Sequence, residues 1–300
     1  MRVVNFGSIN IDIIFAVDHI VLSGETIDSF SLVRSTGGKG ANQSVAFAKA
    51  GLIPIYHAGL IGEDGLWVKD EMVKYGVDVS FIKEIETPTG QALIQLSKEG
   101  ENAIVLYAGA NHAFKQDWIN SVLENFAKND WVMVQNETNE LDFILTEAKR
   151  RDLKICFNPA PFTASVLDLP LHLVDLLIVN EHEAKGISKE SNYALALEKL
   201  INLYPQSDII LTLGKDGVMH GKKGEEVTKF GTWNVPIIDT TAAGDTFIGY
   251  YLNSIMQNLS LKEALKRSSS AANIAITRKG AMQSIPYQNE LSLIDSYPLN

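Results

Sequence analysis

The sequence predicts an α/β fold built on a mostly parallel sheet that helices cover on both faces, with a small second β-sheet beside it. Short apolar, strand-like runs alternate with amphipathic, helix-like segments through most of the 300 residues. This alternation is typical of parallel sheets, because each return to the same edge of a sheet needs a crossover helix. Two regions break the alternation with strand-like content and no intervening helix, and they predict the second sheet.

The predicted core elements follow in chain order. The apolar runs are predicted as buried strands: Val3–Phe6, Ile53–Ala58, Trp131–Gln135, Lys154–Asn158, Leu176–Val179 and Ile209–Leu213. The amphipathic segments between them are predicted as helices: Ala41–Ala50, Leu66–Tyr75, Trp118–Phe126, Leu141–Arg151 and Tyr193–Leu203. Two longer helices with few charges on one face are predicted near the C-terminus: Thr246–Gln257 and Leu261–Thr277.

The second sheet is predicted from residues 13–36 and 89–107. Gly100 and Glu101 predict a hairpin turn between the strand-like runs Ala92–Ser97 and Ala103–Tyr107. A small sheet inserted between βα units, beside a ligand crevice, is a candidate lid. Because no internal repeat, low-complexity segment or flexible linker is evident, we expect residues 1–300 to form a single domain with a lid.

Composition excludes several classes of function. The formal net charge of -10 gives no general attraction to nucleic acid or to an anionic membrane. The single cysteine, Cys156, cannot form an internal disulfide, so the chain needs no oxidising compartment. The apolar start, Met1 to Phe15, is interrupted by Asn5, Asn10 and Asp12, and no apolar run is long enough to span a bilayer. These features predict a cytoplasmic protein.

Two polar motifs near the N-terminus are candidates for a sugar site. Asn10 and Asp12, in the motif GSINID, would point to the same face of an extended chain, where an amide and a carboxylate suit a polyol. The motif GGKGANQ (37–43) places three glycines around Lys39 at a predicted helix start, which suits a polar or anionic group. A turn or cap in the first motif, and an ordinary Gly-rich turn in the second, explain the same residues.

Two motifs after predicted strands are candidates for a nucleotide site. NEHE (180–183) follows a strand, and Glu183 could order water around a magnesium ion. TLGKDG (212–217) is a Gly-rich turn that could hold the phosphates or ribose of a nucleotide. A helix start with acidic residues explains the first motif as well, and a hairpin turn explains the second.

The most informative motif is DTTAAGDTF (239–247). Ala242, Ala243 and Gly244 open onto a predicted helix, whose free N–H groups would form an anion cradle. Asp245 would lie beside that cradle and could accept the proton of an attacking hydroxyl. The alternative is that Asp245 only complements the helix dipole.

Taken together, the motifs resemble those of the ribokinase family, the phosphofructokinase-B type of sugar kinases, in the same order from Gly7 to Pro286. The matching motifs are GSINID (7–12), GGKGANQ (37–43), GLIGEDG (59–65), GEN (100–102), GAN (109–111), NPAP (158–161), NEHE (180–183), TLGKDG (212–217), DTTAAGDTF (239–247) and TRKGAMQS (277–284). The resemblance implies a three-layer α/β/α core with a β-sheet lid, and a homodimer joined through the lids. It also implies transfer of the γ-phosphate of ATP to the 5-hydroxyl of D-ribose.

The resemblance also implies roles for individual residues. The sugar would be held by Asn10, Asp12, Gly38, Lys39, Asn42 and Glu137, with Asp245 as the general base and the amides of Ala242, Ala243, Gly244 and Asp245 as the anion hole. ATP would be held by Asn180, Thr212, Leu213, Gly214, Lys215, Asp216, Gly217 and Gly244, with Glu183 acting through magnesium-bound water. A monovalent cation, typically K⁺, would be held by Asp239, Thr241, Ala275, Arg278, Gly280 and Ser284.

Two positions depart from the family pattern. Tyr250 stands where the family usually has a small residue, and we expect altered packing there without loss of chemistry. The segment 138–140, after Glu137, is also unlike the family. Other acceptors therefore stay open, namely 2-deoxyribose, fructose, a sugar acid or a nucleoside. A non-catalytic sugar sensor is disfavoured because Glu183, Gly244 and Asp245 are all present.

Overall fold

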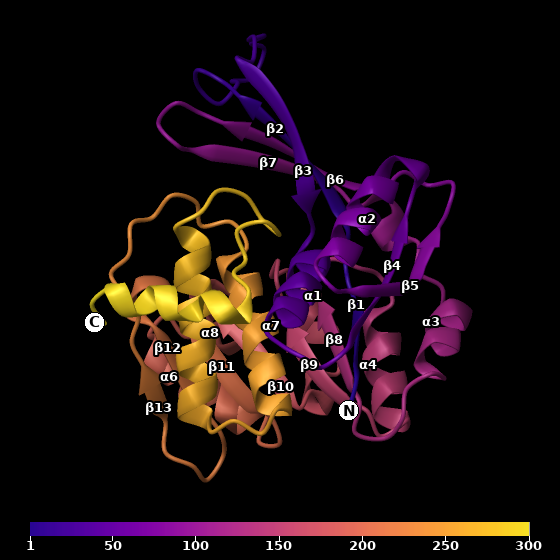
Figure 1. Cartoon of the computed structure of the whole chain (residues 1–300). Helices are drawn as coiled ribbons and strands as arrows, with labels where there is room; N and C mark the ends of the chain where they lie inside the picture. Colours follow the sequence, from indigo (N-terminus) through magenta and orange to yellow (C-terminus); the bar gives the residue numbers. More distant parts are fainter. Residues whose placement is uncertain (300) are drawn as a thin grey trace.

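The computed structural model describes residues 1–299 and contains a nine-stranded sheet between two layers of helices (Figure 1). The strand order across the sheet is β13-β12-β11-β10-β9-β8-β1-β4-β5. The strands are β1 Val3–Phe6, β4 Ile55–Ile61, β5 Asp78–Glu84, β8 Trp131–Gln135, β9 Lys154–Asn158, β10 Leu176–Asn180, β11 Asp208–Thr212, β12 Val218–Gly221 and β13 Thr228–Phe230. All neighbours pair in parallel except β11 with β12 and β12 with β13, which confirms the predicted fold class.

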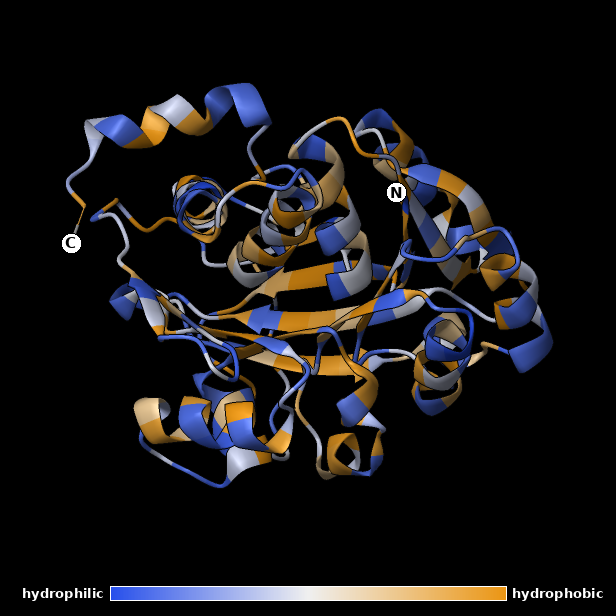
Figure 2. Cartoon of the chain, turned by 90° about the horizontal axis from the view of Figure 1, so that it is seen from below, coloured by the Kyte–Doolittle hydropathy of each residue, from blue (hydrophilic) through white to orange (hydrophobic). Residues whose placement is uncertain are grey.

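The helices divide between the two faces of this sheet, and each layer encloses its own apolar core (Figure 2). One layer contains α1 Lys39–Lys49, α2 Leu66–Lys74, α7 Ala243–Met256 and α8 Leu261–Ile276. The other contains α3 Gln116–Leu123, α4 Leu141–Arg150, α5 Glu181–Ser188 and α6 Tyr193–Leu203. Within residues 1–299, no helix combines the length and the apolar character needed to cross a bilayer.

The carboxyl ends of the parallel strands collect polar side chains at one edge of the sheet. β8, β9, β10 and β11 are apolar inside but end in Gln135, Asn158, Asn180 and Thr212. Side chains alternate between faces, and Met133 and Cys156 belong to the core beneath α1 and α7. Gln135 and Asn158, two positions further along, therefore point toward those same helices.

The predicted second sheet is present and projects from the core at the top of Figure 1. Its strands are β2 Asn10–Ala16, β3 Ser31–Gly37, β6 Gly90–Leu96 and β7 Asn102–Tyr107, in the order β3-β2-β6-β7. β2 pairs antiparallel with β3 and parallel with β6, and β6 and β7 form the predicted hairpin. We call this sheet the lid sheet.

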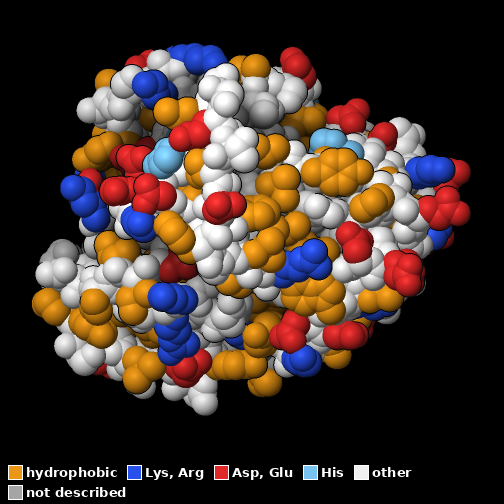
Figure 3. Space-filling view, turned by 90° about the horizontal axis from the view of Figure 1, so that it is seen from above, with side chains coloured by type: hydrophobic (Ala, Val, Ile, Leu, Met, Phe, Trp, Pro, Cys, Tyr) orange, Lys and Arg blue, Asp and Glu red, His pale blue; other side chains and the backbone are white. Residues whose placement is uncertain are grey.

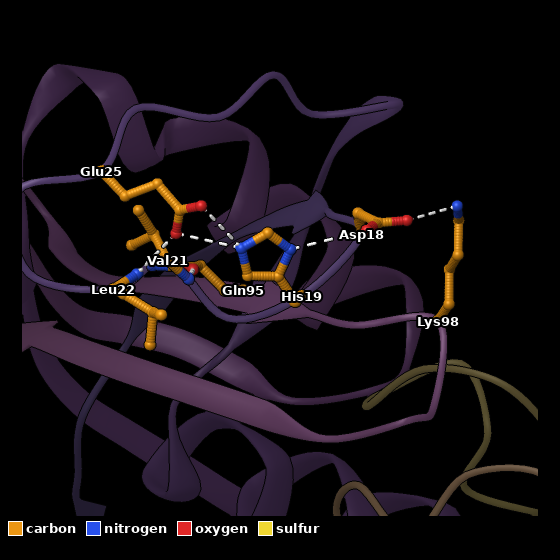
Figure 4. Close-up of polar contacts among 7 residues, drawn as sticks. All are labelled: Asp18, His19, Val21, Leu22, Glu25, Gln95 and Lys98. Atoms are coloured by element: carbon orange, nitrogen blue, oxygen red, sulfur yellow. Dashed lines mark hydrogen bonds and ion pairs between the residues drawn. The ribbon is translucent and has the colours of Figure 1, made fainter.

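Polar contacts hold the loop that joins β2 to β3 at the far end of the lid sheet (Figure 4). The imidazole of His19 lies 2.9 Å from Oε1 of Glu25 and 3.5 Å from Oδ2 of Asp18. Lys98, from the turn between β6 and β7, pairs with the other oxygen of Asp18. The side chain of Gln95, on β6, accepts a hydrogen bond from the backbone of this loop, so the loop is held by β6 as well as by the turn between β6 and β7.

Two edge strands, β5 and β13, the strand β12 beside β13, and one helix were not among the predicted elements. β5 has exposed polar positions, and β13 has only three residues. β12 is four residues long and ends in Gly221, so none of these strands shows a long apolar run. Helix α5 starts inside the motif 180–183, which the sequence left open between a helix start and a ligand loop.

Candidate active site

Asp245 lies in the first turn of α7, beside an uncapped helix N-terminus. Ala242 adopts a left-handed conformation with φ of 59° that turns the chain into the helix, and no side chain caps it. Among the described residues, the N–H groups of Gly244 and Asp245 donate no hydrogen bond. A Cβ atom added to Gly244 would meet no atom within 4 Å. The helix therefore presents free N–H groups to open space, as an anion site requires.

Both carboxylate oxygens of Asp245 accept hydrogen bonds from the start of α1. Asn42 Nδ2 donates to Oδ2 at 3.1 Å, and Gln43 Nε2 donates to Oδ1 at 3.0 Å. The Asp245 residue is only 8% exposed. Asn42 Oδ1 is buried without a hydrogen-bond partner among residues 1–299, so it is an acceptor available to a hydroxyl.

Asn10 and Asp12 lie on β2, at the base of the lid sheet. Asn111 orients Asn10, because its Nδ2 donates to Asn10 Oδ1 at 2.7 Å while its Oδ1 accepts from the backbone of Ile9 at 2.9 Å. The carboxylate of Asp12 lies over Gly37 of β3, where an added Cβ would be 2.0 Å from Oδ1. Gly37 is therefore small because the carboxylate occupies the space above it.

Glu137 lies against the turn into α1. Its Oε2 accepts hydrogen bonds from Ser8 Oγ at 2.5 Å and from the backbone N–H of Lys39 at 3.0 Å. Gly38, at φ of 92°, caps α1, and an added Cβ would lie 2.8 Å from the carbonyl oxygen of Ser8. The sequence-predicted sugar residues are thus brought together around this turn.

The electrostatics of this group are set by one lysine among several carboxylates. Burial raises the pKa of Asp12 to about 7; the carboxylate of Glu137 adds to this and Lys39 opposes it. Burial also raises the pKa of Glu137, with Lys39 again opposing. The pKa of Lys39 is raised, first by Asp245, then by Glu137, Glu183 and Asp12, against the effect of burial. Lys39 therefore remains a cation at neutral pH.

The predicted nucleotide residues lie at the ends of β10 and β11. Asn180 and Glu183 form a capping box: Asn180 Oδ1 accepts from the N–H of Glu183, and Glu183 Oε2 accepts from that of Asn180, each at 2.9 Å. Asn158 also donates to this Oε2 at 3.3 Å. Burial raises the pKa of Glu183, and these hydrogen bonds oppose it. The other carboxylate oxygen of Glu183, Oε1, makes no hydrogen bond within residues 1–299 and could hold a water.

The motif 212–217 forms a hairpin turn between β11 and β12. The N–H of Leu213 donates to the carbonyl of Gly217 at 2.8 Å, and the residues between form a short 3-10 turn of Gly214, Lys215 and Asp216. Gly217 has φ of 86°, and an added Cβ would lie 2.2 Å from the carbonyl oxygen of Phe230. The turn lies next to Asn180, because Asn180 and Thr212 pair across the two strands.

Three of the predicted cation residues, Asp239, Thr241 and Gly280, are in contact with one another. Asp239 accepts backbone hydrogen bonds from Thr241 at 2.9 Å and Gly280 at 2.8 Å. Burial works to raise the pKa of Asp239, but these hydrogen bonds outweigh it and hold the pKa below its usual value. The carbonyl of Ala275 accepts from the N–H of Arg278 at 3.0 Å, and the guanidinium of Arg278 pairs with Glu290.

The predicted cation residues include several oxygen atoms. Ser284 is buried, and its hydroxyl donates to the carbonyl of Ala281 at 2.8 Å. The donors that these two loops offer are a carboxylate, carbonyls and a hydroxyl, as hard cations prefer. In the described part of the chain, no group of three or more His, Cys, Asp or Glu residues could hold a metal ion.

Comparison with known proteins decides the family. The model of the pfkB family of carbohydrate kinases matches residues 1–288. The chain belongs to this family. It is 34% identical to a ribokinase of Haemophilus influenzae over 294 residues, covering 95% of each chain.

Two solved structures share its fold. A ribokinase of Cryptococcus neoformans in complex with ADP is 36% identical, with a TM-score of 0.83, covering 97% of this chain and 99% of that one. A ribokinase of Thermotoga maritima is 31% identical, with a TM-score of 0.86, covering 99% of both.

The site of this pfkB-family kinase includes side chains to which the sequence analysis assigned no role. Gln43 and Asn111 were noted only as letters of motifs, and Ser8 and Gln135 were not distinguished from their neighbours. Gln135 could have been identified because it is a polar residue at the end of an otherwise apolar strand. Asn158 has the same position in the next strand. A polar residue that is buried in this way needs a partner, and the partners here lie on α1.

Proposed function

We propose that this kinase transfers the γ-phosphate of ATP to the 5-hydroxyl of D-ribose. The observation that carries the proposal is the place of Asp245, between the free N–H groups of α7 and the amide of Asn42. A base, an anion cradle and a hydroxyl-binding amide then meet at one point. Similarity to ribokinases over 95% of both chains supports ribose as the acceptor.

The sugar would lie between the lid sheet and the turn into α1. Asn10, Asp12 and Asn42 offer acceptors and donors that match hydroxyl groups, and Lys39 and Glu137 would complete the set. The unpartnered Oδ1 of Asn42 is the best-defined acceptor of this group. Gly38 would allow the chain to approach the sugar closely.

Asp245 would take the proton of the 5-hydroxyl as that oxygen attacks the γ-phosphorus. The free amides of the segment Ala242–Asp245 would stabilise the negative charge on the transferring group. Phosphoryl transfer depends mainly on positioning and on charge stabilisation, and these residues can supply both. The lid sheet would exclude water, the competing acceptor.

ATP would lie across the ends of β10 and β11, on Asn180, Gly244 and the turn 212–217. Glu183 would hold Mg²⁺ through a water, since one of its oxygens is free of hydrogen bonds. Mg²⁺ would neutralise charge on the phosphates. Residues 239–241 and 275–284 would hold K⁺ next to the first turn of α7, with Asp239 as the only carboxylate among the predicted ligands. Because ATP is the phosphate donor, we place the activity in the cytosol.

The lid sheet would also join two copies of the chain. Hydrophobic side chains are widely exposed over the face seen from above, where the lid sheet is foremost (Figure 3). On its strands, Leu32, Val33, Ile104, Val105 and Leu106 are each more than 50% exposed. An apolar surface of this kind is typical of a contact surface, and a homodimer would cover it. Sedimentation analysis of the purified chain tests this association.

The proposed activity is tested by ADP release from ATP and Mg²⁺ against a panel of sugars, with K⁺ present. The proposal expects D-ribose to give the highest kcat/KM. A higher value for 2-deoxyribose, fructose, a sugar acid or a nucleoside would overturn ribose as the acceptor. Binding of ribose without ADP release would favour a non-catalytic sensor.

A further inference from the structure

We propose that Gln43 is a positioning residue for Asp245, and that a buried chain of side chains fixes which end of the Gln43 amide faces the carboxylate. The inference rests on the base role proposed above for Asp245. It concerns residues outside the sugar and nucleotide sites, and it follows from the direction of each hydrogen bond along the chain.

The Gln43 amide uses all of its polar atoms inside the protein. Nε2 donates to Asp245 Oδ1 at 3.0 Å and to Asn158 Oδ1 at 3.3 Å, and Oε1 accepts from Gln135 Nε2 at 2.8 Å. Gln43 is 0% exposed, so a sugar or nucleotide that binds at the surface of the protein cannot contact it directly. An effect of Gln43 on catalysis must therefore pass through the side chains that it contacts. Of these, Asp245 is the proposed base, and Asn158 leads on to Glu183.

The direction of the network is set at Asn5, on β1. Its Nδ2 lies 2.8 Å from the backbone carbonyl of Gly40 and 2.9 Å from Ser44 Oγ. A backbone carbonyl can only accept, so the atom that faces it must be the nitrogen. The Oδ1 atom of Asn5 is then left to face Gln135, as an acceptor.

A buried histidine, His57, fixes the direction in which the Ser44 hydroxyl donates its hydrogen bond. His57 Nε2 lies 3.1 Å from the carbonyl of Gly7, which can only accept, so Nε2 carries the proton. Burial lowers the pKa of His57 to about 4, so the ring is neutral and Nδ1 is an acceptor. Ser44 therefore donates to Nδ1 at 2.8 Å and keeps its lone pairs for Asn5.

The orientation of the Gln135 amide determines the orientation of the Gln43 amide. Its Nε2 donates both to Asn5 Oδ1 at 3.1 Å and to Gln43 Oε1. Its own Oε1 is buried without a partner among residues 1–299, 2.9 Å from where a Cβ of Gly7 would lie. The opposite orientation would place Oε1 against two acceptors. The orientation of Gln135 is thus imposed by its neighbours, and Gln43 must present its N–H₂ to Asp245.

This arrangement explains how the carboxylate is held. Gln43 binds Oδ1 and Asn42 binds Oδ2, so the plane of the carboxylate is fixed from one side. Each carboxylate oxygen keeps a lone pair that these two hydrogen bonds do not use, and such a lone pair can receive a proton.

The test uses Gln43→Glu, which keeps the size of the side chain but replaces the donor with an acceptor. We expect kcat for ribose to fall by about 10²-fold, as for loss of a positioned base. The ribose Kd should change by less than about threefold, and the acid limb of the kcat profile should move to higher pH. Gln206→Glu, on an exposed loop, makes the same charge change and should leave all of these unchanged. Both proteins are compared by circular dichroism and Tm.

Gln135→Glu extends the test to a residue that contacts neither Asp245 nor the exposed site. We expect a smaller fall in kcat, about tenfold, with the same shift of the acid limb. If Gln43→Glu does not fold, Gln43→Met, which also removes the donor to Asp245, and Gln135→Glu test the inference in its place, each with a fall in kcat as the expected result. Folded variants with wild-type kcat and an unchanged pH profile would overturn the inference.

Failure of the proposed function is recognised separately. A wild-type chain without sugar-dependent ADP release would overturn the activity, and full turnover in Asp245→Asn would overturn the base role. An active wild type, an inactive Asp245→Asn and unaffected Gln43 variants would overturn only the positioning role.

Discussion

Asn42 Nδ2 donates a hydrogen bond of 3.1 Å to Asp245 Oδ2, although 203 positions separate the two residues in the chain. The contact exists because α1 and α7 pack closely beneath it. Gly249 of α7 makes this possible, since an added Cβ there would lie 2.5 Å from the backbone nitrogen of Phe47 and from the Cβ of Ala46. The geometry of the site therefore depends on the spacing of two helices.

Asp245→Asn should abolish most of the activity while the site stays intact. The amide cannot accept the hydroxyl proton, so we expect kcat to fall by about 10²-fold or more. Ribose Kd should change little, because the sugar contacts proposed on β2 and α1 remain. Coupled measurement of ADP release and calorimetry of ribose binding check both values. Near-normal turnover would remove the general base from the mechanism.

Gly249→Ala should destabilise the protein and also lower its activity. The added methyl group meets backbone of α1, which cannot move without the helix, and overpacking of this kind costs about 1–3 kcal/mol. If the methyl group pushes α1 and α7 apart, the hydrogen bond between Asn42 and Asp245 should also weaken. Urea denaturation and kcat are the measurements. An unchanged free energy of unfolding would show that α1 and α7 can separate without cost.

Gly244→Ala is the matched comparison, because it adds the same methyl group in the same helix where no atom lies within 4 Å. We expect the free energy of unfolding to stay within about 1 kcal/mol of wild type, or to rise, since alanine is the better helix former. The methyl group would occupy space proposed for the phosphates, so KM for ATP should rise or kcat should fall at least several-fold. Activity equal to wild type would place the phosphates elsewhere.

Asp12→Asn should stabilise the protein above pH 7 while it weakens ribose binding. The folded-state pKa of Asp12 is raised from 3.8 to about 7, so between those values the folded state binds more protons than the unfolded state. The free energy of unfolding therefore falls as pH rises through this window, and the full cost is present above pH 7. Asparagine removes that cost.

Denaturation at pH 4 and pH 8 measures this difference. The variant and the wild type should be nearly equal at pH 4, where Asp12 is protonated in the folded state. At pH 8 the variant should be more stable by up to a few kcal/mol, because one pKa unit corresponds to about 1.4 kcal/mol. Equal stability at both pH values would contradict the raised pKa.

Replacement of K⁺ by tetramethylammonium should lower kcat several-fold, because the large cation cannot enter the oxygen-lined site proposed at Asp239. Asp239→Ala should show low activity that no longer depends on the cation. Initial rates in the two salts at equal ionic strength are the measurement. Wild-type rates that are independent of the cation would remove this site from the proposal.

Tyr250 shows how a departure from the family pattern is accommodated. Its ring is fully buried, and its hydroxyl donates to the carbonyl of Pro286 at 2.7 Å. It lies in α7 near Arg267, and its hydroxyl also lies 3.4 Å from the carbonyl of Lys49 at the end of α1. The expectation of altered packing is thus consistent with these contacts, and the tyrosine ties α7 to the segment that follows α8.

The order of strands and helices was largely predictable. β8 and β9 begin and end at the predicted residues, and α6 matches its predicted range, because apolar runs and their polar boundaries are local features of the chain. The polar motifs were also correctly placed after strands or at helix starts. β5, β12 and β13 were not predicted, because these strands at or next to the edges of the sheet are short or polar and contain no long apolar run.

The motifs predicted which residues belong to the candidate site, but not which of these residues are hydrogen-bonded to one another. Nothing near Gln43 in the chain indicates that its amide meets Asp245, which lies 202 positions away. The raised pKa of Asp12 likewise comes from burial at the base of the lid sheet and from the carboxylate of Glu137, a residue far away in the chain. Local order follows from hydrophobic period and turn residues, whereas hydrogen-bond direction and desolvation arise only when distant segments pack against each other.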